Sequence, residues 1–169
     1  GGPLEEIEPA VATLRRLTGV AKVPAALELL IPELAAGSHK LVIFAVHREV
    51  VGLLAEGLAA FNHGVIIGGV SNTARDASIR KFQTDPKYRV MICNIQAGGT
   101  AWDASVASEC VFVESSWVPG ENAQAAMRLQ NMNRASQVTA RFLSAGGTFD
   151  ERIQRVLARK AADLTDIFD

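Results

Sequence analysis

The chain lacks the features that define several protein classes. Its 169 residues contain two cysteines, one tyrosine and two tryptophans, so a small domain held together by several disulfides is excluded. Cys93 and Cys110 both lie in apolar runs that predict strands. A disulfide between neighbouring strands stays open, but buried reduced thiols are the favoured interpretation.

An excess of charge of one sign is also missing. Lys and Arg total 17 against 18 Asp and Glu, a formal net charge of -1. Such a chain has no global attraction to nucleic acid or membrane, so phosphate recognition must come from a few placed arginines. No apolar run reaches the roughly 18 to 20 uncharged residues of a membrane span, and the N-terminus lacks a secretion signal. These features fit a cytoplasmic protein.

The residues that are present predict one α/β domain. Hydrophobic residues make up 49%, and the length suits a single domain with a full core. Residues 1–3 resemble a cloning scar, so we expect a fragment of a longer protein; residues 4–37 form a helical lead-in, and residues 38–169 form the domain. Helical periodicity predicts helices over 4–19, 22–36, 48–61, 73–86, 121–131 and 147–168. Apolar runs predict strands over 41–46, 64–67, 89–95, 110–115 and 138–143.

The order of these elements predicts the sheet. Strands that alternate with helices favour a mostly parallel sheet with helices on both faces, preceded here by two N-terminal helices. The last helix has Thr148 as a plausible N-cap, with Glu151 as its capping-box partner.

The ends of the predicted strands are the places to look for a site, because ligands of open parallel sheets bind beyond the carboxyl ends. Small and polar residues collect there: 47–48, 68–72, 94–103 and 114–117. A Walker A loop (G-x-x-x-x-G-K-[ST]) and a G-x-S-x-G nucleophile elbow are both absent from the sequence. His39, His47 and His63 are scattered without ligand partners, so no metal is expected.

Three features of the sequence each have two possible interpretations. Residues 97–103 form either a loop whose amides approach a phosphate or a plain tight turn. The tryptophans, Trp102 and Trp117, either stack on a ligand or brace a turn. The basic side chains around one helix form either a face for a phosphodiester backbone or a solvated surface; they are Arg75, Arg80, Lys81, Lys87 and Arg89.

Five sequence blocks each carry only a weak family signal, but their order along the chain makes the combined signal specific. They are KLVIFAVHREV (40–50), GGVSNTARDASIRKFQTDP (68–86), RVMICNIQAGGT (89–100), CVFVESSWVPGENAQA (110–125) and GTFDERIQRVLARK (147–160). They resemble the second RecA-like lobe of Swi/Snf-type ATPases in helicase superfamily two, and most of all the HARP-like annealing-helicase branch and its bacterial relatives. The resemblance covers roughly residues 9–168 and implies a RecA-like three-layer fold.

The resemblance also implies a function. The family is a two-lobed motor that hydrolyses ATP with Mg²⁺ between its lobes and moves along double-stranded DNA. The first lobe, which carries the Walker A lysine, is the implied partner in the same parent protein. This chain would supply the far wall of the ATP cleft and part of the DNA track, and would be inactive alone.

The matching motifs imply roles for individual residues of this chain. Gly99, Asp103, Gln124 and Arg128 would face the nucleotide, with Arg128 as the catalytic arginine that remains. The implied DNA-binding residues are His47, Arg48, Ser71, Asn72, Arg75, Gln96 and Thr100.

Two motifs depart from the family pattern. Motif V usually continues G-x-G-[LI]-[TN]-L-T, whereas this chain has Ala101, Trp102 and Asp103 after Thr100. Motif VI usually reads Q-A-E-D-R-x-H-R-I-G-Q, but Asn131 occupies the place of the arginine finger. Asn is neutral and shorter than Arg, so it cannot stabilise the transferring phosphoryl group; Arg134 is a possible substitute.

Two hypotheses therefore remain. The chain is a lobe of an ATP-dependent DNA translocase or helicase, or it is a non-catalytic regulatory or binding module that keeps the fold without turnover. The implied DNA contact predicts weak, salt-sensitive binding that ignores base sequence.

Overall fold

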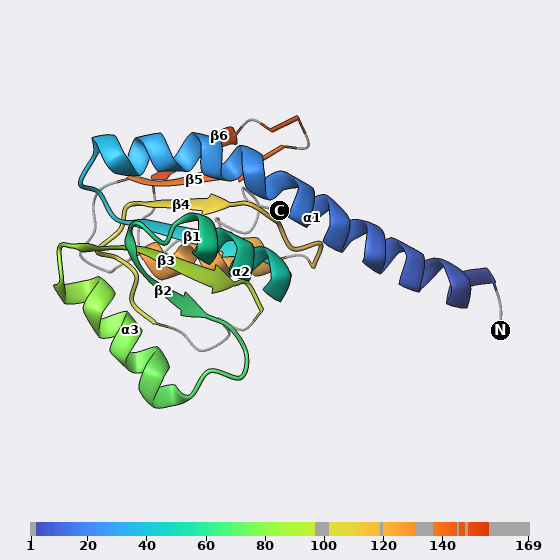
Figure 1. Cartoon of the computed structure of the whole chain (residues 1–169), viewed down its shortest axis with the longest axis horizontal. Coiled ribbons are helices and arrows are strands. Elements are labelled where there is room, and N and C mark those ends of the chain that lie inside the picture. Colours follow the sequence, from blue (N-terminus) through green and yellow to red (C-terminus); the bar gives the residue numbers. More distant parts are fainter. Residues whose placement is uncertain are drawn as a thin grey trace.

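The described part of the chain forms one layered domain with a projecting helix (Figure 1). The structure, a computed structural model, describes residues 3–96, 102–118, 120–130, 137–144, 146–147 and 149–155. The helices are α1 (Pro3–Ala36), α2 (Arg48–Gly57), α3 (Asn72–Thr84), α4 (Glu121–Ala126) and the 3-10 turn η2 (Met127–Leu129). The strands are β1 (Leu41–Ala45), β2 (Asn62–Ile66), β3 (Tyr88–Asn94), β4 (Glu109–Phe112), β5 (Gln137–Leu143) and β6 (Phe149–Arg155).

The strands form one sheet in the order β2-β3-β1-β4-β5-β6. The pairs from β2 to β5 are parallel, and β6 alone runs antiparallel, against β5. The predicted strands are confirmed, with boundaries that move by a few residues at most. Buried strands such as β1 are apolar throughout because helices cover both of their faces.

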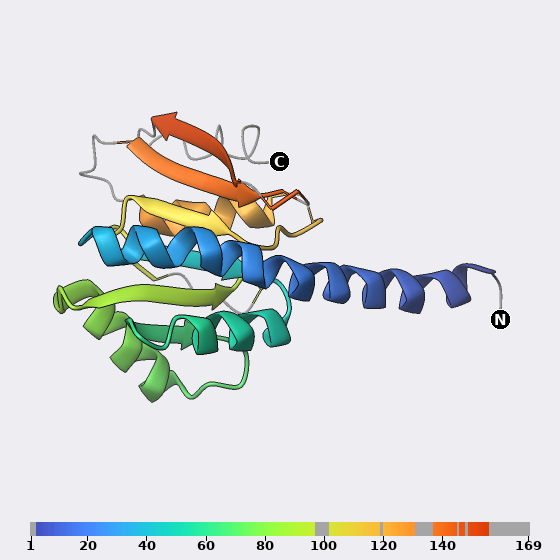
Figure 2. The same cartoon turned by 45° about the horizontal axis from the view of Figure 1, so that its top comes forward.

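Alternate residues of the strands are buried in two separate hydrophobic cores. One core joins Leu41 and Ile43 of β1 to Leu30 of α1 and Leu54 of α2. The other core joins the intervening β1 residues to Phe82 of α3 and to buried alanines of α4. Figure 2 shows α1 lying across one face of the sheet. The expected three-layer α/β architecture with a mostly parallel sheet is therefore confirmed.

The N-terminal helices differ from the prediction of two separate segments. The structure has one continuous helix, α1, in which Gly19, Pro24 and Pro32 are internal. Interior Gly and Pro each weaken a helix, and Pro costs about 3 kcal/mol. Burial of Val23, Ala26, Leu30 and Leu34 against the sheet offsets this cost, which local propensity could not reveal.

The predicted helix over 147–168 is wrong in its first part. Residues 149–155 form β6, which pairs with all seven residues of β5. The edge of β5 offers unpaired backbone groups, and satisfying them outweighs a modest helical preference. Gly147 has a φ of 81°, a left-handed conformation that suits the turn between the two strands. Thr148 and residues 156–169 lie outside the described residues.

The two cysteines follow the favoured interpretation. Cys93 and Cys110 are both buried and carry free thiols. Their strands, β3 and β4, are separated by β1 in the sheet. Within the described residues, no helix combines the length and apolarity that a membrane crossing requires.

Candidate functional site at the carboxyl ends of the strands

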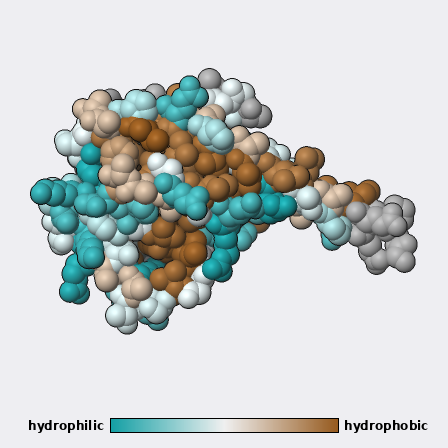
Figure 3. Space-filling model, viewed as in Figure 1, coloured by the Kyte–Doolittle hydropathy of each residue, from teal (hydrophilic) through white to brown (hydrophobic). Residues whose placement is uncertain are grey.

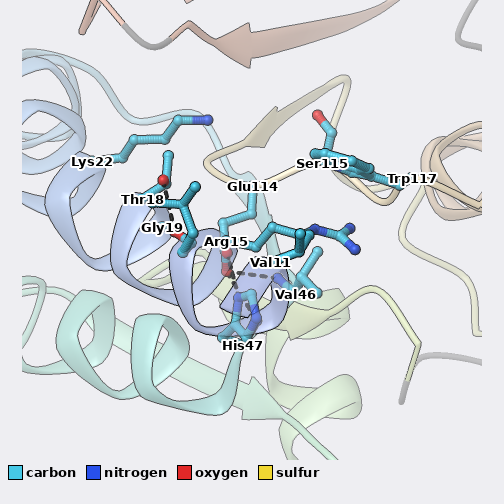
Figure 4. Close-up of a pocket in the computed structure, with 11 residues that line it drawn as sticks. Val11, Arg15, Thr18, Gly19, Lys22, Val46, His47, Glu114, Ser115 and Trp117 are labelled. Carbon is cyan, nitrogen blue, oxygen red and sulfur yellow. Dashed lines mark hydrogen bonds and ion pairs between the residues drawn. The ribbon is translucent and has the colours of Figure 1, made fainter. Parts of the chain in front are cut away.

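Glu114 organises the carboxyl edge of the sheet. Its Oε1 accepts hydrogen bonds from the backbone N–H groups of Val46 and His47, both at 2.9 Å. Its Oε2 lies 2.6 Å from Nδ1 of His47, as Figure 4 shows. The carboxylate is 6% exposed, and a buried carboxylate is stable only when it is paired in this way. The residue after β4 thus ties the loop after β1 in place.

Asn94, at the end of β3 on the other side of β1, also holds the loop after β1. Its Nδ2 donates to the carbonyl of Val46, and its Oδ1 accepts from the backbone N–H of Gln96 at 2.9 Å. The backbone N–H of Ile95 also donates to the carbonyl of Ala45 at 2.9 Å. The ends of β1, β3 and β4 therefore form one rigid, hydrogen-bonded platform.

A cavity of about 280 Å³ lies between this platform and α1 (Figure 4). His47 and Glu114 line it from the sheet side, and Arg15 and Lys22 line it from α1. Val11 and Leu14 add apolar surface. The cavity combines cationic side chains with an apolar wall, which suits an amphipathic partner or an anion.

The two tryptophans turn out to have different environments. Trp102 is 8% exposed and packs edge-on against Phe82, with ring centroids 6.0 Å apart. Trp117 is 72% exposed, and the Arg15 guanidinium lies 4.0 Å from its ring centroid. Trp102 is therefore a core residue that braces its loop, whereas Trp117 presents aromatic surface at the edge of the cavity.

A second group of side chains lies on the opposite face of the sheet, around η2. The backbone N–H of Ala104 donates to the carbonyl of Arg128 at 2.8 Å, which joins the segment after β3 to the segment after α4. Asp103 accepts from the backbone N–H of Ser105 through Oδ1, and its carbonyl accepts from Gln83 of α3. The sequence-predicted Asp103 and Arg128 are thus brought onto neighbouring backbone.

The charges of Arg75 and Arg128 both act on the pKa of Cys93. Burial raises the pKa of the Cys93 thiol to about 12, and the charges of Arg128 and Arg75 act in the opposite direction. Burial also lowers the pKa of Arg128; the Cys93 thiolate would raise it and the Arg75 charge lowers it further. Arg75 and Arg128 are both partly buried, and the charges of both act on the Cys93 thiol of β3.

The remaining predicted residues lie along the same edge. His47 and Gln96 line a second cavity of about 240 Å³ with Trp117. Arg48 begins α2, and its Nη1 lies 3.9 Å from the position that a Cβ on Gly69 would take.

Three other predicted residues have a structural role or a surface position. Ser71 caps α3, because its Oγ accepts from the backbone N–H of Ala74 at 3.2 Å. Asn72 starts the same helix and is exposed, and Gln124 is exposed on α4. Gly99, Thr100, Asn131 and Arg134 lie outside the described residues.

Sequence reasoning missed Arg15 and Lys22 of the cavity, and it placed Asn94 and Glu114 at the strand ends without giving either a role. The signal for Glu114 was present, since an acid that ends the apolar run CVFVES must be buried or functional. Nothing in the local sequence connects Arg15 and Lys22 to a strand end about 100 residues away. Among the described residues, His, Cys, Asp and Glu side chains do not gather in groups of three or more that could hold a metal.

The fold and the strand-end platform define an α/β domain of the RecA-like class. Known proteins agree: the fold matches the C-terminal part of the Fun30 ATPase domain with a TM-score of 0.65 at 19% identity, over 87% of this chain and 52% of that one. No family model matches the sequence.

Curated sequences identify the family. The DNA annealing helicase and endonuclease ZRANB3 of Homo sapiens is 32% identical over 162 residues, which are 95% of this chain and 15% of that protein. The chromatin-remodeling ATPase INO80 of Mycosarcoma maydis is 30% identical over 145 residues, 85% of this chain and 8% of that protein. The chain belongs to the Swi/Snf-type ATPases of helicase superfamily two, as their second RecA-like lobe. It spans less than a sixth of the length of these relatives.

Proposed function

We propose that this chain is the second lobe of an ATP-dependent translocase of double-stranded DNA. It supplies one wall of the ATP cleft and part of the DNA track, and it is inactive without a first lobe of the same parent protein. In a bacterium it would act in the cytoplasm, at the nucleoid. The observation that carries the proposal is the hydrogen bond between Ala104 and Arg128, because it joins the segments that correspond to motifs V and VI.

The environment of Arg128 supports a nucleotide nearby. Burial and the charge of Arg75 both lower the pKa of Arg128. A phosphate beside the two guanidinium groups would favour their charged forms. ATP with Mg²⁺ would supply the phosphoryl group to be transferred, held chiefly by the first lobe. On this side Gly99, Asp103, Gln124 and Arg128 would face it.

We assign DNA contact to the loops beyond the carboxyl ends of the strands and to the first turn of α3. The proposed residues are His47, Arg48, Ser71, Asn72, Arg75, Gln96 and Thr100. Support comes from their position, since loops beyond the carboxyl ends of parallel strands carry ligand contacts. Arg80 and Lys81 continue the basic surface along α3 and are both exposed.

The ATPase assignment is tested at Asn131 in the parent protein. Asn131→Arg restores a positive charge at the arginine-finger position, so DNA-stimulated ATP hydrolysis should rise, within the 10³- to 10⁵-fold range that such arginines contribute in other NTPases. Asn131→Gln is the matched control, which lengthens the side chain without adding charge. Equal rates for the parent and Asn131→Arg would contradict the loss of the finger. If the parent protein hydrolyses no ATP with Asn or with Arg at position 131, the non-catalytic module is favoured. The neutral Asn131 is the feature that suggests this second hypothesis.

The DNA assignment is tested by titrating labelled duplex at low salt. Binding should be weak and independent of base sequence, and it should fall as salt rises. Replacing Arg80 and Lys81 by Ala should weaken it and reduce the salt slope by about one to two. Arg16→Ala, which removes one exposed charge from α1, is the control. Affinity that is unchanged by the double substitution would contradict this DNA surface.

A further inference from the structure

The amino ends of the strands form a second edge of the sheet, and this edge also carries a cavity. The volume of this cavity is about 350 Å³. Its polar lining comes from Ser38 before β1, Asn62 at the start of β2, and Lys87 and Arg89 at the start of β3. Because these strands are parallel, their amino ends lie together on the side of the domain opposite the strand-end platform (Figure 1). The amino-edge cavity is therefore separate from the candidate site.

The lining of the amino-edge cavity is cationic. Lys87 and Arg89 contribute two positive charges, while Ser38 and Asn62 contribute a hydroxyl and an amide. Among the described residues that line this cavity, none carries a carboxylate. Figure 3 shows hydrophilic surface at the left of the view, where α3 ends and β3 begins. A hollow lined by charge of one sign attracts ions of the other sign, so this cavity favours an anion.

A β-bulge sets the position of Arg89. Asn62 of β2 pairs with Tyr88 of β3, and the next residue of β2, His63, pairs with Val90. In this pairing Arg89 is therefore an extra residue. Bulges bend a strand locally and re-aim a side chain, and they are frequent at sheet rims and beside functional sites. The irregularity in this parallel sheet thus falls on an arginine that lines the cavity.

The guanidinium of Arg89 is held in place but is incompletely paired. Its Nε donates a hydrogen bond to the carbonyl of His39 at 2.6 Å. Its Nη2 is buried and has no hydrogen-bond partner among the described residues. A buried donor without an acceptor is unfavourable, and the planar guanidinium fork matches the paired oxygens of a phosphate. The side chain is thus positioned with a spare donor for an oxyanion.

Negative groups of the adjoining turn are occupied by other partners. Oδ1 of Asp85 accepts a hydrogen bond from the backbone N–H of Lys87 at 2.9 Å. Nζ of Lys40 donates to the carbonyls of Phe82 and Asp85, which offsets the negative end of the α3 dipole. Within the described part of the chain, no carboxylate forms an ion pair with Lys87 or Arg89. Both cations therefore stay available to an anion from outside the chain.

We propose that the amino-edge cavity is a binding site for a phosphate group. The Arg89 guanidinium and the Lys87 ammonium bind the phosphate oxygens, and Ser38 and Asn62 donate further hydrogen bonds. Phe61 adds an apolar wall for the organic part of a phosphate ester. The phosphate belongs to a small molecule or to a nucleic-acid backbone, since both present the same oxyanion. The site goes beyond the proposed function and uses none of the residues assigned there to ATP or DNA.

Titration of the 169-residue chain with inorganic phosphate tests the site. The ionic strength is kept constant, and the amide NMR signals are followed. The signals of Asn62, Lys87 and Arg89 should shift and reach saturation. Chloride at the same ionic strength should not reproduce these shifts, because it cannot engage the guanidinium fork through two oxygens.

Three variants locate the binding. Lys87→Ala removes an exposed charge and leaves the core intact, and it should weaken phosphate binding about tenfold, because a hydrogen bond to a charged group contributes about that much. Arg89→Lys keeps the positive charge but loses the fork, so it should also weaken binding. Arg16→Ala, which removes one positive charge from α1, is the matched control and should leave the affinity unchanged. The amide spectrum of each variant shows directly whether its fold is kept.

Duplex DNA as a second ligand identifies the source of the phosphate. If duplex shifts the same three amides and Lys87→Ala weakens its binding, the phosphate is that of a nucleic-acid backbone; if only inorganic phosphate does so, it is that of a small molecule. Shifts that do not saturate, equal shifts with chloride, or an affinity that Lys87→Ala leaves unchanged would each overturn the site. ATP hydrolysis enters none of these outcomes, so this inference and the proposed function fail separately.

Discussion

The two halves of α1 belong to one continuous helix but meet different environments. From Val23 to Leu34 the helix buries four apolar side chains in the core of the sheet. From Ile7 to Leu17 it exposes four others on a different side. The half from Val23 to Leu34 is therefore stabilised by packing on the sheet, whereas the apolar side chains from Ile7 to Leu17 face solvent. Similar composition in adjacent segments thus does not imply similar packing.

The boundary between the halves lies at Gly19, where the helix passes the strand-end platform. A Cβ at this position would meet the Glu114 carboxylate and Val50 of α2. The helix can therefore approach the platform closely only because Gly19 has no side chain. The same close approach encloses the cavity between α1 and the strand ends.

The largest expected effect is on the free energy of unfolding, and it distinguishes the two halves of α1. Leu30→Ala removes a fully buried side chain and should lower the free energy of unfolding by about 2–5 kcal/mol. Leu14→Ala in the isolated chain should change it by less than about 0.5 kcal/mol, since this side chain is exposed. Urea unfolding of both variants measures the difference. Equal losses would mean that the N-terminal half is packed within this chain after all.

The second largest effect tests the close approach of α1 to the strand-end platform at Gly19. Gly19→Ala should lower the free energy of unfolding by about 1–3 kcal/mol, because Glu114 is held by three hydrogen bonds and cannot move away cheaply. Gly52→Ala on α2 is the matched control, since nothing lies within 4 Å of its Cβ position. That change should stabilise the protein by about 0.5–1 kcal/mol through helix propensity. If both substitutions stabilise the protein, the close approach at Gly19 is refuted.

The smallest effect concerns the exposed half. Arg15→Ala removes the cation–π contact with Trp117, which at an exposed site is worth about 0.5–1 kcal/mol. Acrylamide quenching of tryptophan fluorescence should increase, because one face of Trp117 is uncovered while Trp102 stays buried. Trp117→Phe should remove the quencher-sensitive part of the signal. Quenching that Arg15→Ala leaves unchanged would show that Arg15 does not cover the ring.

Much of the fold was predictable because its signals are local. Apolar runs such as 41–46 identify buried strands, and their alternation with helices predicts a mostly parallel sheet. The order of five motif blocks predicts the family, which the comparisons confirm. The site was predictable only in outline. Strand ends point to His47 and Gln96, but the carboxylate that positions His47 is Glu114, which follows β4 and lies 67 residues later in the chain.

The errors have a common physical origin. The continuity of α1 through Gly19 and Pro24 depends on burial against the sheet, and β6 depends on the open edge of β5. Both are contacts between distant segments, and each outweighs a local preference of a few kcal/mol at most. The nucleotide and DNA roles assigned to the site residues all stay predictions, and Gly99, Thr100, Asn131 and Arg134 also lie outside the described residues.

The sequence by itself determined the elements and the family, because hydrophobic periodicity and motif order are written along the chain. The place of Asn131 at the arginine-finger position stays a prediction from the resemblance. Tertiary structure alone decided which residues meet: Glu114 with His47, Arg15 with Trp117, and Ala104 with Arg128. It decided as well that one half of α1 is buried and the other exposed, since burial depends on which surfaces the whole fold brings within reach.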